Sequence, residues 1–304
     1  MRSPDVQASW DTWPYRLGCP VWNCKHWEGE VYPDKASSQE SLHWYARCFG
    51  TVEGNSTFYG LPAREALDRW CTQSSPGFRF AMKVPRAISH DAKLVACEGP
   101  LQRFLEVLSV LHAQDRLGPT FLQLGPDFSS KYVGPLEAFL ERWPKTYPLA
   151  VEFRHRDWFD EATWEERIGQ CLRDLQIDRV IFDSRPLNSR ESKDATEEQA
   201  QRRKPQSPWR ATVTHTRPFV RLIGLNDVHE VESYWVAWAD QVVRWIQEGL
   251  QPWIFTHAPD DRYAPRLARR FHELVREKLP HVPELPRPFP PAPSVPQQLS
   301  LFDL

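Results

Sequence analysis

The sequence predicts an α/β fold, a single-domain TIM (β/α)8 barrel, on two observations. Short apolar segments alternate along the chain with helix-sized amphipathic segments, which favours a parallel sheet. The apolar segments number eight, whereas a doubly wound sheet commonly has fewer strands and carries a glycine-rich phosphate turn that this sequence lacks. The strands are expected to start near residues 17, 52, 78, 120, 149, 179, 219 and 253.

Helices are expected between the strands because apolar residues recur there at helical spacing. The first should begin near Ser37, which can form a capping box with Glu40. Pro62 suits the first turn of the second helix, which should run to Gln73. Further helices are expected over residues 99–112, around 136–143, and over 161–176, 231–249 and 265–279.

Two segments depart from this alternation. Residues 184–217, after the sixth strand, are polar and lack apolar periodicity, so we interpret them as a solvated or disordered insertion. The alternative is a lid over the end of that strand. The other segment is proline-rich, with eight prolines between residues 280 and 296. We therefore expect a barrel domain over 1–279 and a tether over 280–304.

Composition narrows the class of protein. The formal net charge of -2 over 304 residues gives no general reason to bind a polyanion. The six cysteines are scattered, which fits reduced thiols in a cytoplasmic protein, and neither an export signal nor a membrane-length apolar run is visible. The sequence contains no HExxH motif, P-loop, nucleophile elbow or Rossmann fingerprint, which argues against hydride transfer, nucleotide triphosphate hydrolysis and serine esterase chemistry.

Polar side chains recur at the carboxyl ends of the predicted strands. Successive side chains of a strand point to opposite faces, so Glu152 and Arg154 share one face while Val151 and Phe153 share the other. The carboxyl ends of barrel strands meet around one axis, where the catalytic groups of barrel enzymes lie. The candidate site residues of this kind are Glu53, Asn55, Lys83, Gln123, Glu152, Arg154, His155, Asp183, Arg221 and His257.

The cations of this set predict an anionic ligand. Lys83, Arg154 and Arg221 are expected to form a clamp, because arginine can grip a phosphate or carboxylate with two parallel hydrogen bonds. Asn55 and Gln123 are assigned to the same binding role.

The carboxylates and histidines are the candidate catalytic groups. Glu152 or Asp183 could act as a general base or bind a divalent metal ion, while His155 and His257 could relay protons. The cofactor is otherwise unknown. In the structural alternative, these charges only neutralise one another inside the barrel, with desolvation offsetting most of the attraction.

Several motifs together resemble the YecE-like family, domain of unknown function 72. They cover residues 55–59, 80–86, 123–126, 151–155, 220–222 and 264–266. The resemblance implies a TIM barrel with a charged pocket built from Asn55, Lys83, Glu152, Arg154, His155, Asp183 and Arg221. It implies no reaction. The sequence departs from the family's pattern at Ile223, where a histidine is usual, and at Thr256-His257, where an asparagine pair is usual.

The end of the tether resembles the short motif by which bacterial proteins dock on the DNA sliding clamp. Gln298 would be the polar anchor, and Leu299, Leu301 and Phe302 would supply the apolar contacts. The alternative is that these residues fold back onto the barrel.

The sequence therefore favours an enzyme acting on an anionic, phosphate-bearing ligand in the barrel mouth. If the tail binds the clamp, the ligand is DNA or a repair intermediate, and a divalent metal would assist phosphodiester chemistry. The alternative is a binding module that holds a metabolite or a nucleic-acid end without turnover.

Overall fold

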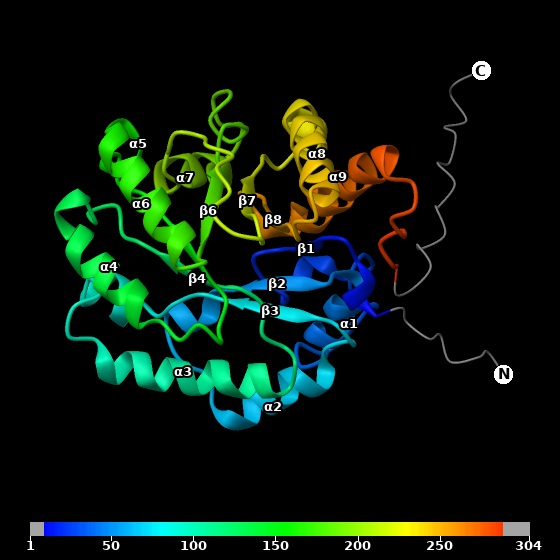
Figure 1. Ribbon diagram of the computed structural model, residues 1–304. Coiled ribbons are helices and arrows are strands. Elements are labelled where there is room, and N and C mark those ends of the chain that lie inside the picture. The colour runs from blue at the N-terminus through cyan, green and yellow to red at the C-terminus, as the bar shows by residue number, and fades with distance from the viewer. Residues whose placement is uncertain (1–8, 288–304) are drawn as a thin grey trace, which may run out of the picture.

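All eight predicted strands are present, and each begins within one residue of its expected position. The computed structural model describes residues 9–287 of the chain (Figure 1). All strand pairs are parallel. The strands are β1 (Arg16–Gly18), β2 (Thr51–Gly54), β3 (Arg79–Met82), β4 (Thr120–Gln123), β5 (Leu149–Glu152), β6 (Asp178–Asp183), β7 (Phe219–Ile223) and β8 (Trp253–His257).

The strands divide between two hydrogen-bonded sheets. One has six strands in the order β1-β8-β7-β6-β5-β4, and the other is the β2-β3 pair. The larger sheet curls into a half-barrel, consistent with a TIM-like fold (Figure 1). Within residues 9–287 the ladder does not run continuously through all eight strands, so the expected barrel is present only in this coarser form.

Backbone hydrogen bonds outside the regular ladders cross the two gaps between the sheets. Glu53 N donates to Cys19 O (3.1 Å) beside β1, and Val84 N donates to Phe121 O (2.9 Å) in β4. A Cβ atom on Gly18 would lie 2.1 Å from Thr51 O, so only glycine permits this approach of β1 to β2.

Helices pack around the strands, with α2 and α3 beside β2 and β3, and α8 and α9 beside β7 and β8 (Figure 1). The sequence did not predict the short α5 or α7. Ser37 does pair with Glu40, but the first helix begins one turn later than expected. The helices are α1 (Ser41–Cys48), α2 (Arg64–Gln73), α3 (Glu98–Ala113), α4 (Val133–Arg142), α5 (Asp157–Asp160), α6 (Ala162–Asp174), α7 (Ala195–Arg203), α8 (Glu232–Gln247) and α9 (Ala264–Lys278).

The inner face of the sheets has an apolar floor. Its rings are in contact, with centroid distances of 5.4 Å for Phe121–Phe219 and 4.8 Å for Phe219–Phe255. The next side chain on the same face comes two residues later, so polar residues at the strand ends stand directly above this floor. The floor consists of Ala81, Phe121, Ala150, Val180, Phe219, Trp253 and Phe255.

The polar insertion after β6 is folded, contrary to our interpretation of it as solvated or disordered. Asp194 caps α7 by accepting hydrogen bonds from the backbone of Thr196 and Glu197. Leu187 and Ala200 are buried in the main core. The sequence did not predict α7 because it has no apolar periodicity: only small or isolated apolar residues of the insertion face the core.

The expected boundary at residue 279 is also displaced. Val282 and Leu285 are buried, and His272 Nε2 donates to Pro283 O (2.9 Å). The first part of the proline-rich segment, residues 280–287, therefore packs against α9.

No helix among the described residues is long and apolar enough to cross a bilayer. All six cysteines are free thiols.

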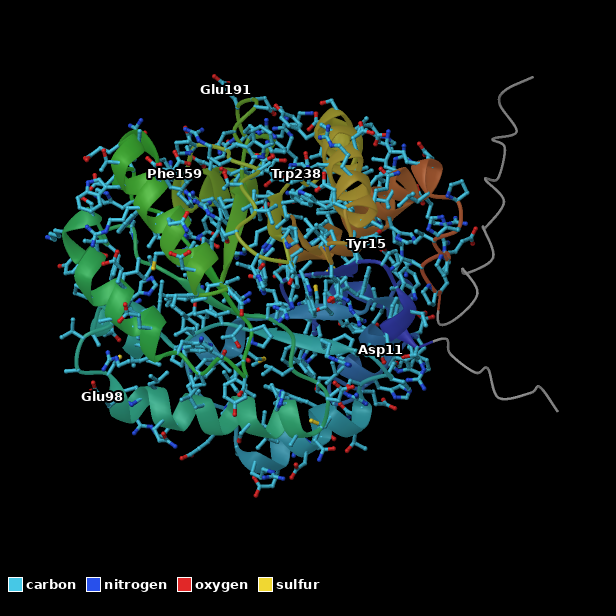
Figure 2. The ribbon with its side chains drawn as sticks, viewed as in Figure 1. Asp11, Tyr15, Glu98, Phe159, Glu191 and Trp238 are labelled. Atoms are coloured by element: carbon cyan, nitrogen blue, oxygen red, sulfur yellow. The ribbon has the colours of Figure 1, made fainter. Side chains whose placement is uncertain are left out.

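Side chains fill the space between strands and helices, as for Trp238 of α8 (Figure 2).

Asp178, at the start of β6, is a buried carboxyl with an incomplete set of partners. Its Oδ1 accepts a hydrogen bond from Arg217 N (2.9 Å), but its Oδ2 has no hydrogen-bond partner, and the Arg217 guanidinium stays 3.8 Å away. Burial raises the pKa of Asp178 to about 7. The raised pKa means that ionisation of this group opposes folding at neutral pH.

We predict that Asp178→Asn stabilises the protein at pH 8 by about 2 kcal/mol, since asparagine keeps the acceptor for Arg217 without the buried charge. The wild type loses stability as pH rises from about 4 to about 7, the pKa of the folded state. The gain should therefore vanish near pH 4. Urea denaturation at both pH values measures it, with the exposed Asp240→Asn as control. An equal effect of Asp178→Asn at both pH values would contradict the charge argument.

Candidate functional site

Arg221 of β7 is the centre of an ion-pair network above the apolar floor. Its Nε and Nη2 donate to the two oxygens of Glu53 on β2 (2.8 and 2.7 Å), and its Nη1 donates to Glu152 Oε2 on β5 (2.5 Å). Arg221 is 3% exposed and both glutamates are 0% exposed. One guanidinium therefore joins three strands across the interior.

Other polar side chains donate the remaining hydrogen bonds to both carboxylates. Glu152 Oε1 also accepts hydrogen bonds from Arg154 Nε (2.6 Å) and Gln123 Nε2 (3.1 Å). Glu53 accepts from Asn55 Nδ2 (2.9 Å) and from His257 Nε2 (3.0 Å). All four oxygens of the two carboxylates are thus engaged.

These contacts keep both glutamates ionised. Burial alone would raise the pKa of Glu152, but Arg221 and then Arg154 hold it at about 2. Burial is likewise overcome at Glu53, where Arg221 and then His257 keep the pKa well below its usual range. Burial lowers the pKa of His257 to about 4 despite its contact with Glu53, so neutral His257 donates through Nε2. Glu152 is therefore a poor general base, contrary to one of the roles predicted for it.

Lys83 lies just beyond β3 and has no such partner. It is 8% exposed, and its Nζ lies 4.1 Å from the ring centroid of Phe58 and 5.9 Å from that of Phe121. Among residues 9–287 no hydrogen bond or ion pair engages this nitrogen. Burial, and after it the charge of Arg221, lowers the pKa of Lys83 to about 7.

Lys204 is a further cation of the cluster that was not expected from the sequence. This partly buried lysine follows α7 directly and belongs to the insertion. Burial, and then the charge of Arg221, lowers the pKa of Lys204 to about 8, and the charges of Glu53, Arg154 and Glu152 also act on it. Its ammonium has no ion pair in the part of the chain that the structure describes. No sequence signal separates it from the other basic residues of the insertion.

The charges of the cluster do not cancel. Arg221 and Arg154 balance Glu53 and Glu152, and His257 is neutral at pH 7. The protonated forms of buried Lys83 and partly buried Lys204 add positive charge to this balance. Asp261 is a further acidic group that interacts electrostatically with Lys204, and burial raises the pKa of its carboxyl. The Arg154 guanidinium uses only Nε in the network, and its terminal nitrogens have no hydrogen-bond partner among residues 9–287.

Asp183 does not join this cluster. In the register of β6 and β7, Phe182 stands opposite Arg221, and the Arg221 guanidinium lies 5.5 Å from the Phe182 ring. Phe182 therefore takes the inward position and Asp183 points outward. There it accepts hydrogen bonds from Arg185 Nη2 (2.7 Å) and Trp238 Nε1 of α8 (2.7 Å). Our prediction that Asp183 lies in the pocket is wrong.

His155 also lies apart from the ion-pair network. Its Nδ1 accepts a hydrogen bond from Asp157 N (3.2 Å) at the start of α5. This is the contact of a loop residue that orders a helix start. The catalytic role predicted for His155 gains no partner from the network.

The residues expected to bind a divalent metal are separated. Glu152 faces the interior, whereas Asp183 faces α8. Residues 9–287 contain no group of three or more His, Cys, Asp or Glu side chains placed to hold a metal ion. The tail residues Gln298, Leu299, Leu301 and Phe302 lie outside the described part of the chain.

Fold and site together define an α/β protein with a TIM-like parallel sheet and a charged cluster at the carboxyl ends of its strands. Residues 16–293 match the model of the family described as "Protein of unknown function DUF72". The chain therefore belongs to the DUF72 family.

Relatives and solved structures agree with this assignment. UPF0759 protein YecE of Escherichia coli K12 is 34% identical over 286 residues, 94% of this chain and 99% of YecE. UPF0759 protein YunF of Bacillus subtilis is 26% identical over 148 residues, 46% of this chain and 51% of YunF. Two crystal structures of DUF72 family proteins share the fold. The one from Enterococcus faecalis has a TM-score of 0.66 and 19% identity, and the match covers 86% of this chain and 95% of that one. The one from Thermotoga maritima has a TM-score of 0.63 and 22% identity, and the match covers 88% of this chain and 99% of that one.

We predict that Arg221→Met lowers the free energy of unfolding at pH 8 by about 3–5 kcal/mol, because it leaves two carboxylates buried without their main partner. The wild-type network loses its contribution only as pH falls below about 4.5 toward the low pKa values of the folded state. In the variant, burial raises both pKa values, so the deficit should shrink at pH 5.

Guanidinium denaturation at pH 8 and pH 5 measures this difference. The matched control is Arg244→Met on the exposed face of α8. Its side chain pairs only with Gln241 in the part of the chain that the structure describes, so the loss should be small. A cost for Arg221→Met no greater than for this control would show that the network contributes little.

Proposed function

We propose that the protein binds an anionic, phosphate-bearing small molecule at the carboxyl ends of its strands. The observation that carries this proposal is the pair Lys83 and Lys204, two lysines of one charged cluster without an ion-pair partner among the described residues. Unpaired buried cations are costly unless a ligand compensates them. A phosphate group supplies both the charge and the hydrogen-bond acceptors.

The roles of the cations differ from those expected. Arg221 is occupied by two carboxylates, so we assign it to positioning the site. Lys83, Lys204 and the free end of Arg154 form the proposed clamp. The low exposure of Lys83 favours a small molecule or a strand end over the side of a DNA duplex.

The proposal includes a complete (β/α)8 barrel around this pocket. The hydrogen bonds from Glu53 N to Cys19 O and from Val84 N to Phe121 O support it at the two gaps in the ladder. The Arg221–Glu53 pair also links the β2-β3 sheet to the larger sheet through the interior.

The same geometry bears on the choice between an enzyme and a binding module. All carboxylate oxygens of Glu53 and Glu152 already accept hydrogen bonds, so neither is well placed to act as a general base in hydrolysis. This favours the binding module. Turnover at this site would depend on Lys83, the buried group whose pKa lies near neutrality.

We predict that glycerol 3-phosphate binds the wild type and that Lys204→Met and Lys83→Met each raise its Kd about tenfold or more, since each removes a charge-assisted hydrogen bond. Isothermal titration calorimetry in low-salt buffer at pH 7 measures the effect. The control is Lys278→Met, which removes a lysine paired with Asp240 far along α9. Unchanged affinity in both pocket variants, or no binding by the wild type, would overturn the proposal.

We also propose that residues 298–302 recruit the protein to the DNA sliding clamp, on the resemblance of this segment to clamp-binding peptides. The scattered thiols of the chain fit the cytoplasmic location that this requires.

We expect the full chain to retain purified bacterial clamp in a pull-down, and Leu301→Ala with Phe302→Ala to abolish retention by removing the apolar anchors. Ser300→Ala, which leaves both anchors in place, should retain the clamp. Equal retention by the double variant would remove recruitment through this motif.

A further inference from the structure

We propose that Lys83 Nζ is a nucleophile that forms a Schiff base with an aldehyde or ketone bearing a phosphate group. This inference rests on the anion-binding pocket proposed above and names the substrate class of that pocket. It assigns Lys83 to the chemistry, and Lys204 with Arg154 to the phosphate.

The backbone of Lys83 is held from three sides. Its N–H donates to Gly54 O (3.1 Å), its carbonyl accepts from Thr57 Oγ1 (2.6 Å), and the next amide, Val84 N, donates to Phe121 O (2.9 Å). A nucleophile needs such a fixed base, because small displacements from the reactive geometry are costly. Lys204 follows α7 in the insertion and has no comparable anchorage in a sheet.

The surroundings of the Lys83 amine suit a reactive lysine. Phe58 and Phe121 form an apolar wall, and no carboxylate pairs with the nitrogen among residues 9–287. Lys83 keeps 8% of its surface exposed, so it is not wholly sealed from solvent. An amine of this kind can be reached by a small carbonyl compound.

The protonation state agrees with this geometry. A nucleophilic amine must be neutral, and an ordinary lysine is almost wholly protonated at pH 7. Burial and the neighbouring charge of Arg221 bring the pKa of Lys83 to about 7, so roughly half of the molecules carry the neutral amine there.

The reaction balances without an oxidant or a reductant. The lone pair of neutral Nζ attacks the carbonyl carbon, and the C=O π electrons move to oxygen. A proton then passes from nitrogen to that oxygen, giving a carbinolamine. Loss of the hydroxyl group and of the second amine proton releases one water and leaves the C=N bond.

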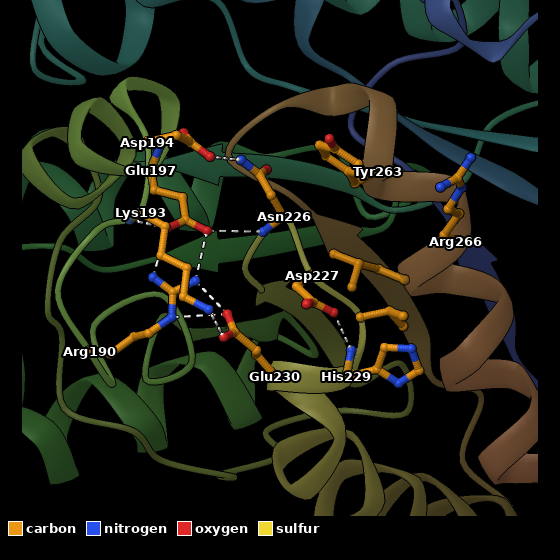
Figure 3. Close-up of a pocket in the computed structure, with 12 residues that line it drawn as sticks. Arg190, Lys193, Asp194, Glu197, Asn226, Asp227, His229, Glu230, Tyr263 and Arg266 are labelled. Atoms are coloured by element: carbon orange, nitrogen blue, oxygen red, sulfur yellow. Dashed lines mark hydrogen bonds and ion pairs between the residues drawn. The ribbon is translucent and has the colours of Figure 1, made fainter. Parts of the chain in front are cut away.

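The insertion that carries Lys204 is held in place by contacts with the loop after β7. Arg190 pairs with Glu197 of α7 and with Glu230 beyond β7, while Asn226 Nδ2 donates to Asp194 (2.9 Å), as Figure 3 shows. These contacts fasten the segment that carries Lys204 to the loop after β7. Lys83 itself is 8% exposed, and restricted access of water favours an imine because water is the product of its formation.

The test is reductive trapping of the full-length protein with dihydroxyacetone phosphate and sodium cyanoborohydride at pH 7, followed by peptide mass spectrometry. Reduction converts the imine into a stable secondary amine. We expect the adduct on Lys83 at a level at least about tenfold above that on exposed lysines, since those are protonated at this pH. Lys83→Arg should lose this adduct, and Lys278→Met should retain it.

Two further measurements separate the possible failures. Dihydroxyacetone, which lacks the phosphate, should label Lys83 less, and Lys204→Met should reduce labelling by the phosphate ester. Binding of glycerol 3-phosphate to the same preparation reports on the pocket alone. Binding without a Lys83 adduct would overturn the Schiff-base assignment and leave the anion site standing. Neither binding nor adduct would overturn both, and labelling spread over lysines in proportion to exposure would refute the inference.

Discussion

The structure depends on the neutralisation of charge at one level of the interior. Arg221 bridges Glu53 and Glu152 from opposite parts of the strand array, and no other side chain touches both carboxylates among the described residues. Carboxylates removed from water are expensive unless paired and fully hydrogen-bonded. Asn55, Gln123, Arg154 and His257 provide the remaining bonds. The apolar floor of Phe121, Phe219 and Phe255 lies below this layer, so the network closes the core from above.

This arrangement separates the groups that pair with one another from those proposed to bind a ligand. The arginine and glutamate charges balance, and their low pKa values keep the carboxylates ionised. The two lysines make no hydrogen bond to this network. Their lowered pKa values follow first from their burial and second from repulsion by the charge of the Arg221 guanidinium.

The sequence predicted all eight strands and much of this layer for one reason. Apolar and polar residues alternate at the strand ends, so Glu152, Arg154 and Arg221 could be placed on a shared interior face before any contact was known. The same reasoning failed at Asp183, because the face of a strand depends on its register against its neighbour, and Phe182 rather than Asp183 stands opposite Arg221. Lys204 was beyond prediction, since its place depends on how a helix without apolar periodicity packs against the loop after β7.

The central claim is that the excess positive charge in this cluster is carried by Lys83 and Lys204, whose pKa values are lowered. The most direct measurement is an NMR titration of the protein with 13C-labelled lysine ε-carbons, with Lys83→Arg and Lys204→Arg used for assignment. The account predicts one resonance that titrates at about 7 and one at about 8, belonging to Lys83 and Lys204. Titration of both near the ordinary lysine value of about 10.4 would contradict it.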